Sequence, residues 1–149
     1  MKLISHRGNI DGPDPEKENL PLYIKTALTL GYEVEIDVWN LNGAWFLGHD
    51  KPQHSIGLDF LMTPNFLCHA KNLAALDKML VHTNIHCFWH QEDHYTVTSR
   101  GYIVSYPGYE ITGRTICMKP ELASPDSVSS CYAICSDYIG RWGAWPKSA

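Results

Sequence analysis

The sequence predicts an α/β fold built on a parallel sheet, and three observations support this prediction. Short runs rich in β-branched and aromatic residues recur between Gly, Pro, Asn and Asp residues, as is typical of strands. Two of the intervening segments have apolar residues at helical spacing, and each of these segments precedes a strand. The chain has 149 residues, of which 44% are hydrophobic and 19% charged, so we expect one globular domain over residues 1–149.

Seven runs are predicted as strands, with an eighth if one of them serves only as a hairpin partner. The seven are Lys2–Ser5, Tyr32–Trp39, Ala44–Leu47, Phe66–Ala70, His86–Trp89, Tyr102–Ser105 and Thr115–Met118, and the eighth is Tyr132–Ser136. The helical spacing lies in Leu20, Tyr23, Ile24, Ala27 and Leu28, and again in Leu73, Leu76, Met79 and Leu80. Gly31 is placed to end the first helix, and Asn72 to cap the second.

Composition excludes several classes of partner. The formal charge of -4 provides no basic surface for nucleic acid or an anionic membrane. No stretch approaches the roughly 20 apolar residues of a membrane span. The five cysteines have no CxxC spacing, which argues against a disulfide framework or a zinc ribbon. We therefore expect a cytoplasmic protein with reduced thiols and with neither a nucleic-acid nor a membrane partner.

Ionisable residues recur at the C-terminal ends of the predicted strands, often two positions apart on one face. The pairs are Glu35 and Asp37, His69 and Lys71, His90 and Glu92, and Lys119 and Glu121, and further candidates are His6, Arg7, His49, Asp50 and Asp137. In a parallel barrel or an open α/β sheet, these strand ends meet at the rim where ligands bind. These segments therefore direct ionisable groups toward one place.

Each of the sharpest candidates has a functional and a structural interpretation. Glu35 and Asp37 repel each other unless a cation neutralises them, and their oxygens suit Mg²⁺ or Ca²⁺; the alternative is a solvated edge face. His6 and His49 can serve as acid and base, or can be structural histidines. Arg7 offers a fork for a phosphate, or is a surface salt-bridge partner.

The remaining histidines raise the question of a transition metal. His69, His86, His90 and His94 lack the HExxH helix spacing, and the regular four-residue intervals run through a predicted strand. Zinc is therefore the minority interpretation of these residues.

Four ordered motifs in residues 2–50 carry a family resemblance. They are His6-Arg7-Gly8, Glu18-Asn19, Glu35-Ile36-Asp37-Val38 and Gly48-His49-Asp50. This order resembles the glycerophosphodiester phosphodiesterases of the phospholipase C-like phosphodiesterase superfamily, whose pattern reads HRG, ENT, ExD and HD in the first third of a (β/α)₈ barrel. The segment Ile134-Cys135-Ser136-Asp137-Tyr138 is similar to the family's closing strand.

The resemblance implies a divalent-metal phosphodiesterase. It makes Glu35 and Asp37 metal ligands, His6 and His49 the catalytic acid/base pair, and Arg7, with Glu18 and Lys71, the substrate-binding residues. His69-Ala70-Lys71 has a His where the family has the Glu of a Glu-x-Lys, so His69 is the expected third ligand. A typical barrel of this kind uses roughly 250 residues, so the chain is expected to form a miniaturised (β/α) TIM-like barrel with several outer helices missing.

We therefore predict a metal-dependent phosphodiesterase that acts on a glycerophosphodiester or a similar small phosphate diester, with Mg²⁺ or Ca²⁺ as cofactor. One alternative is a degenerate barrel that binds a phosphate or polyol ligand without turnover. The other is a transition-metal hydrolase that uses His69 and His90 with the carboxylates.

The missing helices also predict the oligomeric state. They would leave apolar strands uncovered in the second half of the chain, at Phe88, Tyr102, Val104, Ile116 and Met118. A second copy of the chain is the simplest cover, so we predict a homodimer. The competing cover is the tail from Trp142 to Trp145.

Overall fold

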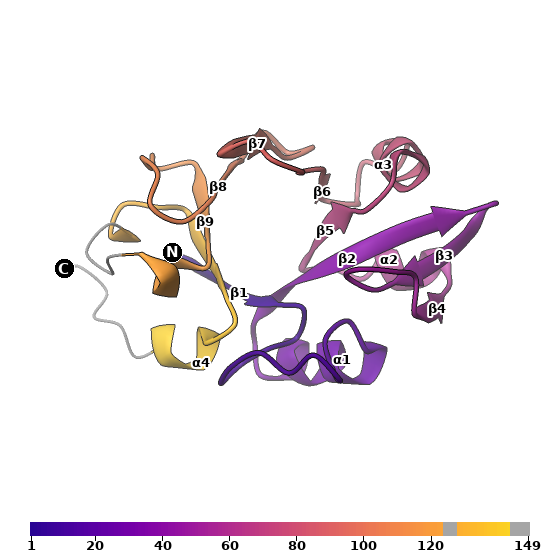
Figure 1. Cartoon of the computed structure of the whole chain (residues 1–149), viewed down its shortest axis with the longest axis horizontal. Coiled ribbons are helices and arrows are strands. Elements are labelled where there is room, and N and C mark those ends of the chain that lie inside the picture. The colour runs from indigo at the N-terminus through magenta and orange to yellow at the C-terminus, as the bar shows by residue number, and fades with distance from the viewer. Residues whose placement is uncertain (124–127, 144–149) are drawn as a thin grey trace.

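In the computed structural model, the strands form one mixed sheet that curls into a half-barrel (Figure 1). The structure describes residues 1–123 and 128–143. Across this part of the chain, the central strands run parallel in the order β6, β5, β2, β1, β10, β9 and β8. These strands are β1 (Lys2–His6), β2 (Glu33–Leu41), β5 (Phe66–Ala70), β6 (Cys87–Phe88), β8 (Ile103–Ser105), β9 (Thr115–Met118) and β10 (Ala133–Ser136).

Antiparallel strands extend the sheet at two places. The strand β2 continues beyond its parallel neighbours and folds back onto β3 (Ala44–Leu47), which pairs with β4 (His54–Ile56). Asn42 and Gly43 have φ angles of 52° and 88°, as a two-residue hairpin turn of the right twist requires. At the other end, β7 (Tyr95–Val97) pairs antiparallel with β8.

Two helices in the described residues exceed one turn, and both end before residue 81. The first, α1 (Pro21–Thr29), begins at a proline, and α3 (Leu73–Leu80) is capped by Asn72, whose side chain accepts a hydrogen bond from the amide of Ala75. Shorter pieces are α2 (Leu58–Leu61), α4 (Ile139–Trp142) and the 3₁₀ turn η1 (Pro120–Leu122). No helix in the described ranges is long and apolar enough to cross a membrane.

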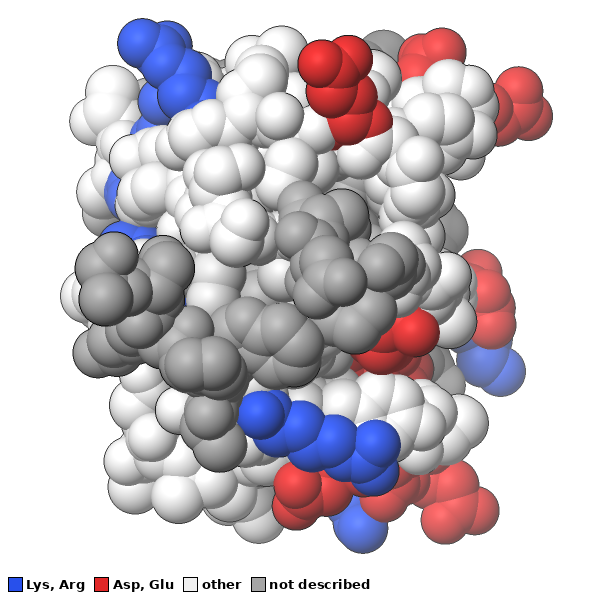
Figure 2. Space-filling model, turned by 90° about the vertical axis from the view of Figure 1, so that its left-hand side faces the viewer, with Lys and Arg blue, Asp and Glu red and all other residues white. Residues whose placement is uncertain are grey.

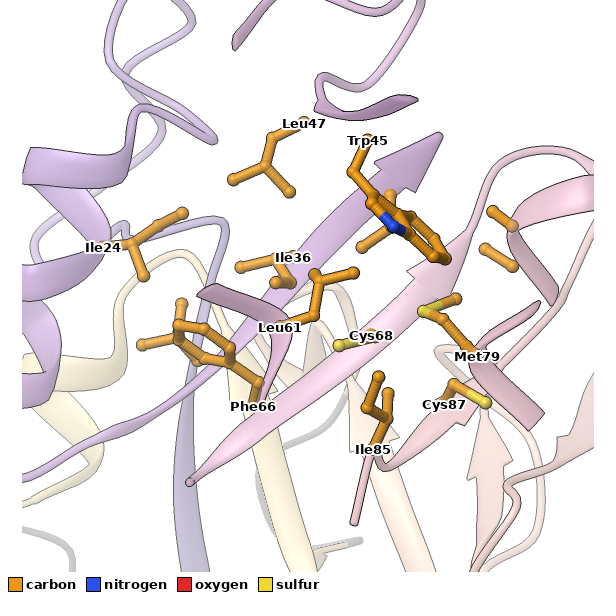
Figure 3. Close-up of a cluster of buried hydrophobic side chains, with 14 of the residues drawn as sticks. Ile24, Ile36, Trp45, Leu47, Leu61, Phe66, Cys68, Met79, Ile85 and Cys87 are labelled. Atoms are coloured by element: carbon orange, nitrogen blue, oxygen red, sulfur yellow. The ribbon is translucent and has the colours of Figure 1, made fainter. Parts of the chain in front are cut away.

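The alternation of side chains along β2 separates the core from the candidate site. Val34, Ile36 and Val38 pack on the helix-covered side, and Glu35 and Asp37 lie on the other face of the same strand. Figure 3 shows this cluster, with Ile36 and Leu61 of α2 lying between Ile24 of α1 and Met79 of α3. The buried apolar face therefore fixes the register that presents the two carboxylates on the opposite face.

Two further clusters complete the core. One contains buried side chains of β1, β5, β6, β8, β9 and β10, namely Ile4, Leu67, Phe88, Val104, Ile116, Met118, Ala133 and Cys135. The other packs Ile139 and Trp142 of α4 against Cys117 of β9 and Ile134 of β10. All five cysteines are buried free thiols.

The predicted miniaturised (β/α) TIM-like barrel is wrong. Helices alternate with strands only as far as α3, and within the described residues β6 to β10 follow one another without an α-helix. The sheet is also mixed, and β6 and β8 are not hydrogen-bonded as neighbours in the described part of the chain. Only residues 106–114 separate β8 from β9, which is fewer than the dozen or more residues that a helical crossover takes.

Four of the five side chains that the homodimer prediction took to be uncovered are buried within the single chain, and the fifth, Tyr102, is partly buried. Phe88, Val104, Ile116 and Met118 are at most 5% exposed, because they pack together in the second cluster. The competing cover is present in part, since Trp142 is buried, whereas Trp145 lies outside the described residues. Figure 2 shows the side on which β8, β9 and α4 lie, where charged residues of both signs stand mainly around the margin. The homodimer stays a prediction.

Candidate metal and phosphate site

The parallel strands bring most of the predicted site residues together at their C-terminal ends. His6 ends β1 and pairs in register with Glu35 of β2, and Asp37 pairs in register with His69 of β5. Asp137 follows β10, which is the other neighbour of β1. Residues from positions 6 to 137 thus meet at one end of the sheet, because adjacent parallel strands end side by side.

Glu35, Asp37 and His69 form a candidate metal centre. One ligand atom from each lies within 4.8 Å of the others, and His69 Nδ1 is 3.6 Å from Glu35 Oε1 and 3.4 Å from Asp37 Oδ1. Both oxygens of Glu35 and the Oδ1 atom of Asp37 are buried without a hydrogen-bond partner. Because buried carboxylate oxygens otherwise carry a large desolvation cost, this donor set fits a bound cation.

The ring of His69 is held with Nδ1 toward the carboxylates. Its Nε2 donates to the carbonyl oxygen of His90 at 3.2 Å, and the ring stacks on Phe88 with centroids 4.6 Å apart. Burial lowers the pKa of His69, but the close contacts with the carboxylates of Asp37 and Glu35 outweigh it and raise the pKa to about 9. Without a metal, the ring is therefore an imidazolium between two carboxylates.

The Oδ2 atom of Asp37 is held by two neighbouring side chains, Asn19 and Arg7. Oδ2 accepts a hydrogen bond from Asn19 Nδ2 at 2.9 Å, and Asn19 Oδ1 accepts from the Asp37 amide. Arg7 Nε lies 2.9 Å from the same Oδ2, although its N–H does not point along a hydrogen bond, so we treat this contact as a charge pair. Burial raises the pKa of Asp37, but His49, His69 and Arg7 hold it well below its usual range.

Arg7 links the carboxylates to His49. It donates through Nη1 to Glu18 at 3.1 Å and through Nη2 to His49 Nδ1 at 2.7 Å. Since an arginine nitrogen can only donate, Nδ1 is the acceptor and a neutral His49 carries its proton on Nε2. Arg7 is thus engaged by Asp37, Glu18 and His49, and its predicted contact with a substrate phosphate stays a prediction.

Gly48 sets the position of His49. Its φ is +152°, and a Cβ atom there would stand 2.0 Å from the carbonyl oxygen of Lys51, so no other residue fits this turn. The Gly48 carbonyl also accepts from Trp39 Nε1 at 2.7 Å. His49 borders a cavity of about 360 Å³, whose lining is Arg7, Pro15, Glu18, Asn19, His49, Asp50, Lys51 and Gln53.

His6 forms a buried pair with Asp137. His6 Nδ1 lies 2.6 Å from Asp137 Oδ1, which leaves Nε2 directed toward Glu35 Oε2 at 3.7 Å. Burial raises the pKa of Asp137, but contacts with His6, Asn9 and Lys119 outweigh it and lower the pKa. The sequence marked Asp137 as a strand-end candidate without a role, and only the tertiary structure reveals its contact with His6.

A hydrogen-bonded shell around Asp137 was also missed from the sequence. Asn9 Nδ2 donates to Asp137 Oδ1 at 2.8 Å, and Lys119 Nζ is 3.1 Å from Oδ2. Glu121 accepts from the Asp137 amide at 3.2 Å and from the Ser136 hydroxyl at 2.8 Å. The Lys119 and Glu121 pair was visible at a predicted strand end, but Asn9 carried no signal beyond its place after the first motif.

Two other predicted residues lie at the margin of the site. Lys71 Nζ is 3.8 Å from Asp37 Oδ1, so it is close enough to neutralise charge there. The side chain of His90 points away, because it stacks on Tyr106 at 3.7 Å and Nε2 bonds the carbonyl of Asp93. Only the backbone of His90 reaches His69, so this arrangement does not use the His90 ring as a metal ligand.

Comparisons of the chain with protein-family models, with curated proteins and with solved structures find no match in any of the three.

Proposed function

We propose that this protein is a divalent-metal-dependent phosphodiesterase that acts on a small phosphate diester. The observation that carries the proposal is the set of buried carboxylate oxygens on Glu35 and Asp37 that lack a hydrogen-bond partner. Next to them lie a histidine paired with a carboxylate, His6, and a second histidine on the rim, His49. The ordered motifs that resemble the glycerophosphodiester phosphodiesterases supply the same four residues.

The two histidines can divide acid/base chemistry between them. Asp137 accepts the proton of His6 Nδ1, which leaves Nε2 as a lone pair on the side of Glu35, where it can take a proton from the nucleophile. His49 would be the acid in its protonated form, in which it can give the Nε2 proton to the leaving alkoxide while Nδ1 keeps its own proton 3.5 Å from Asp37 Oδ2. A divalent cation supplies polarisation of the phosphoryl oxygens and neutralises the charge that develops on them.

The solvent exposure of the two histidines also agrees with His6 as the base and His49 as the acid. The His6 side chain is only 5% exposed, whereas that of His49 is 42% exposed and borders the 360 Å³ cavity. A leaving group must depart into solvent, so the exposed histidine suits the acid role. The polar lining of the cavity suits a hydroxyl-rich or charged head group rather than an acyl chain.

The test is a panel of phosphate diesters assayed with metal, with EDTA, and with metal restored. We expect turnover that EDTA abolishes and metal restores, and we expect Asp37→Asn and Glu35→Gln to lose both turnover and metal binding. His82→Gln, in the turn between α3 and β6 and outside the residues assigned to the site, is the matched control and should keep both. Turnover that survives in Glu35→Gln and Asp37→Asn would contradict the proposal.

One observation favours the alternative of binding without turnover. The pKa of His69, raised to about 9, makes the ring a cation between Glu35 and Asp37, so the chain carries its own neutralising charge. On this alternative, a phosphate or polyol ligand binds at the rim without metal. Ligand binding that is unchanged by EDTA, with no hydrolysis across the panel, would support it.

A further inference from the structure

The third donor of the candidate metal centre is an imidazole, and this sets it apart from an all-carboxylate site. His69 Nδ1 faces Glu35 Oε1 and Asp37 Oδ1 at 3.6 and 3.4 Å. Separations of about 3–4 Å are those of ligand atoms that share one small divalent cation. The site therefore offers one nitrogen and two carboxylates at the spacing of a common ion.

The imidazole is fixed in this orientation by the fold. His69 pairs in register with Asp37, stacks on Phe88 and donates from Nε2 to the carbonyl of His90 at 3.2 Å. Metal-binding histidines typically donate their other ring nitrogen in this way, which sets the ring orientation and leaves the remaining nitrogen free as a ligand. The His69 side chain is only 12% exposed, so the surrounding protein holds the ring in this position.

We propose that the site formed by Glu35, Asp37 and His69 selects a first-row transition ion such as Zn²⁺ over Mg²⁺ and Ca²⁺. The inference rests on the metal site of the proposed function and specifies which ion occupies it. It departs from the Mg²⁺ or Ca²⁺ that the paired carboxylates alone predict.

Ligand chemistry supports this choice. Mg²⁺ and Ca²⁺ are hard cations that take oxygen ligands, whereas imidazole is a common ligand of zinc and other transition ions. The supply of protein oxygens is also short, because Asn19 and Arg7 occupy Asp37 Oδ2, which leaves Oδ1 and the two oxygens of Glu35. Three protein ligands with an open position are typical of a catalytic zinc site, whereas Ca²⁺ takes 6–8 oxygens.

The experiment measures ion affinities of the metal-free full-length protein by titration calorimetry with Zn²⁺, Mn²⁺, Mg²⁺ and Ca²⁺. Zn²⁺ binds most sites more tightly than Mg²⁺, so the diagnostic quantity is how a variant changes the ratio of the two affinities. His69→Glu replaces the nitrogen by oxygen at the same place. We expect it to lower Zn²⁺ affinity by about tenfold or more and to raise Mg²⁺ affinity.

Two further variants keep the result interpretable. His90→Gln leaves the backbone carbonyl that orients His69 and removes only a ring that points elsewhere, so its affinities should equal those of the wild type. His69→Gln removes the nitrogen without adding a charge, and it should lose Zn²⁺ binding even if His69→Glu does not fold. The absorption spectrum of the Co²⁺ form provides a second readout, because replacing the nitrogen ligand shifts its visible bands.

The outcomes separate this inference from the proposed function. Equal ratios of Zn²⁺ to Mg²⁺ affinity in the wild type and His69→Glu would overturn the inference, and Mg²⁺-supported turnover would then leave the phosphodiesterase intact. A large change in that ratio without turnover on any diester would uphold the inference and overturn the function. Absence of binding by all four ions would overturn the inference and the metal dependence together.

Discussion

Single residues in the site balance buried charges against one another. Asp37 is fully buried, and it contacts Arg7, His49, His69 and Lys71 within 4 Å. A buried charge is tolerated only when it is paired and hydrogen-bonded, so removing one partner leaves the others uncompensated. Substitutions here therefore affect both folding and chemistry, and the informative ones change hydrogen bonding while keeping the shape of the side chain.

Asp137→Asn is such a change. The amide cannot hold the proton of His6 Nδ1 as the carboxylate does, so the lone pair on Nε2 is no longer fixed toward the site. We expect turnover to fall by about 10²-fold with little change in KM, the scale of general acid/base catalysis. Steady-state kinetics across pH measure this, with thermal unfolding to show that the variant is folded. Wild-type turnover would mean that Asp137 does not position His6.

His86 predicts a pH dependence of stability. Burial lowers its pKa to about 4, with Arg100 and Lys2 contributing, so the folded protein holds a neutral ring that Thr98 contacts at 2.8 Å. In the unfolded chain the ring titrates near 6.5, so the unfolded state binds the proton first. The contribution of His86 is fully present above about pH 6.5 and is lost as pH falls toward 4.

The measurement is the urea unfolding free energy between pH 7 and pH 4 for the wild type and His86→Gln. The slope in this window should be smaller in the variant, because the group responsible for part of it is absent. Identical slopes would show that His86 titrates alike in the folded and unfolded states.

At the scale of elements, α3 and β2 are joined through one side chain. Asn72 Oδ1 accepts from the amides of Ala75 and Asn40, and Nδ2 donates to the Asn40 carbonyl at 2.8 Å. The residue thus caps α3 and fastens it to the strand that carries Glu35 and Asp37. Because α3 supplies Ala75 and Met79 to the core behind β2, this cap supports the register of the site.

We predict that Asn72→Ala lowers the unfolding free energy by about 1–2 kcal/mol, the usual cost of losing an N-cap. Asn72→Asp keeps the acceptor but loses the donor to Asn40, so its loss should be smaller. Leu73→Ala is the control, since Leu73 is 66% exposed and the change should cost little. Urea denaturation compares the three variants, and equal stabilities of Asn72→Ala and Leu73→Ala would contradict the role of the cap.

At the scale of the whole molecule, α4 covers part of the sheet that has no long helix, at β9 and β10. Trp142 is 8% exposed and packs in the cluster with Cys117 and Ile134. We expect Trp142→Ala to cost about 3 kcal/mol, as is usual for loss of a large buried side chain, and truncation after Gly140 to cost more. Chemical denaturation measures both, and wild-type stability of the truncated chain would show that this cover is dispensable.

The homodimer is tested separately by sedimentation equilibrium at micromolar concentration. A mass near twice the 16.9 kDa of the chain would support it. The monomer mass would contradict it and would leave the packing of Trp142 as the cover of β9 and β10.

Local sequence pattern alone located most of the strands and the two longer helices. All eight predicted runs contain observed strands, and both predicted helices are present, with the cap at Asn72 and Gly31 at a φ of 91° beyond α1. The missed strands β4 and β7 are three residues long, too short for a periodic signal. The same alternation of apolar and polar residues placed Glu35 and Asp37 on one face, because side chains alternate along any strand.

What only the tertiary structure decided is how these elements are joined in space and which polar atoms meet. The sequence led to a miniaturised (β/α) barrel, because strand ends look alike in a closed barrel and in an open, curled sheet. The pairing of His6 with Asp137 and the orientation of His69 by the His90 carbonyl join segments far apart in the chain. Such contacts follow from strand order and register, which are set by packing over the whole molecule rather than by the residues that end up in contact.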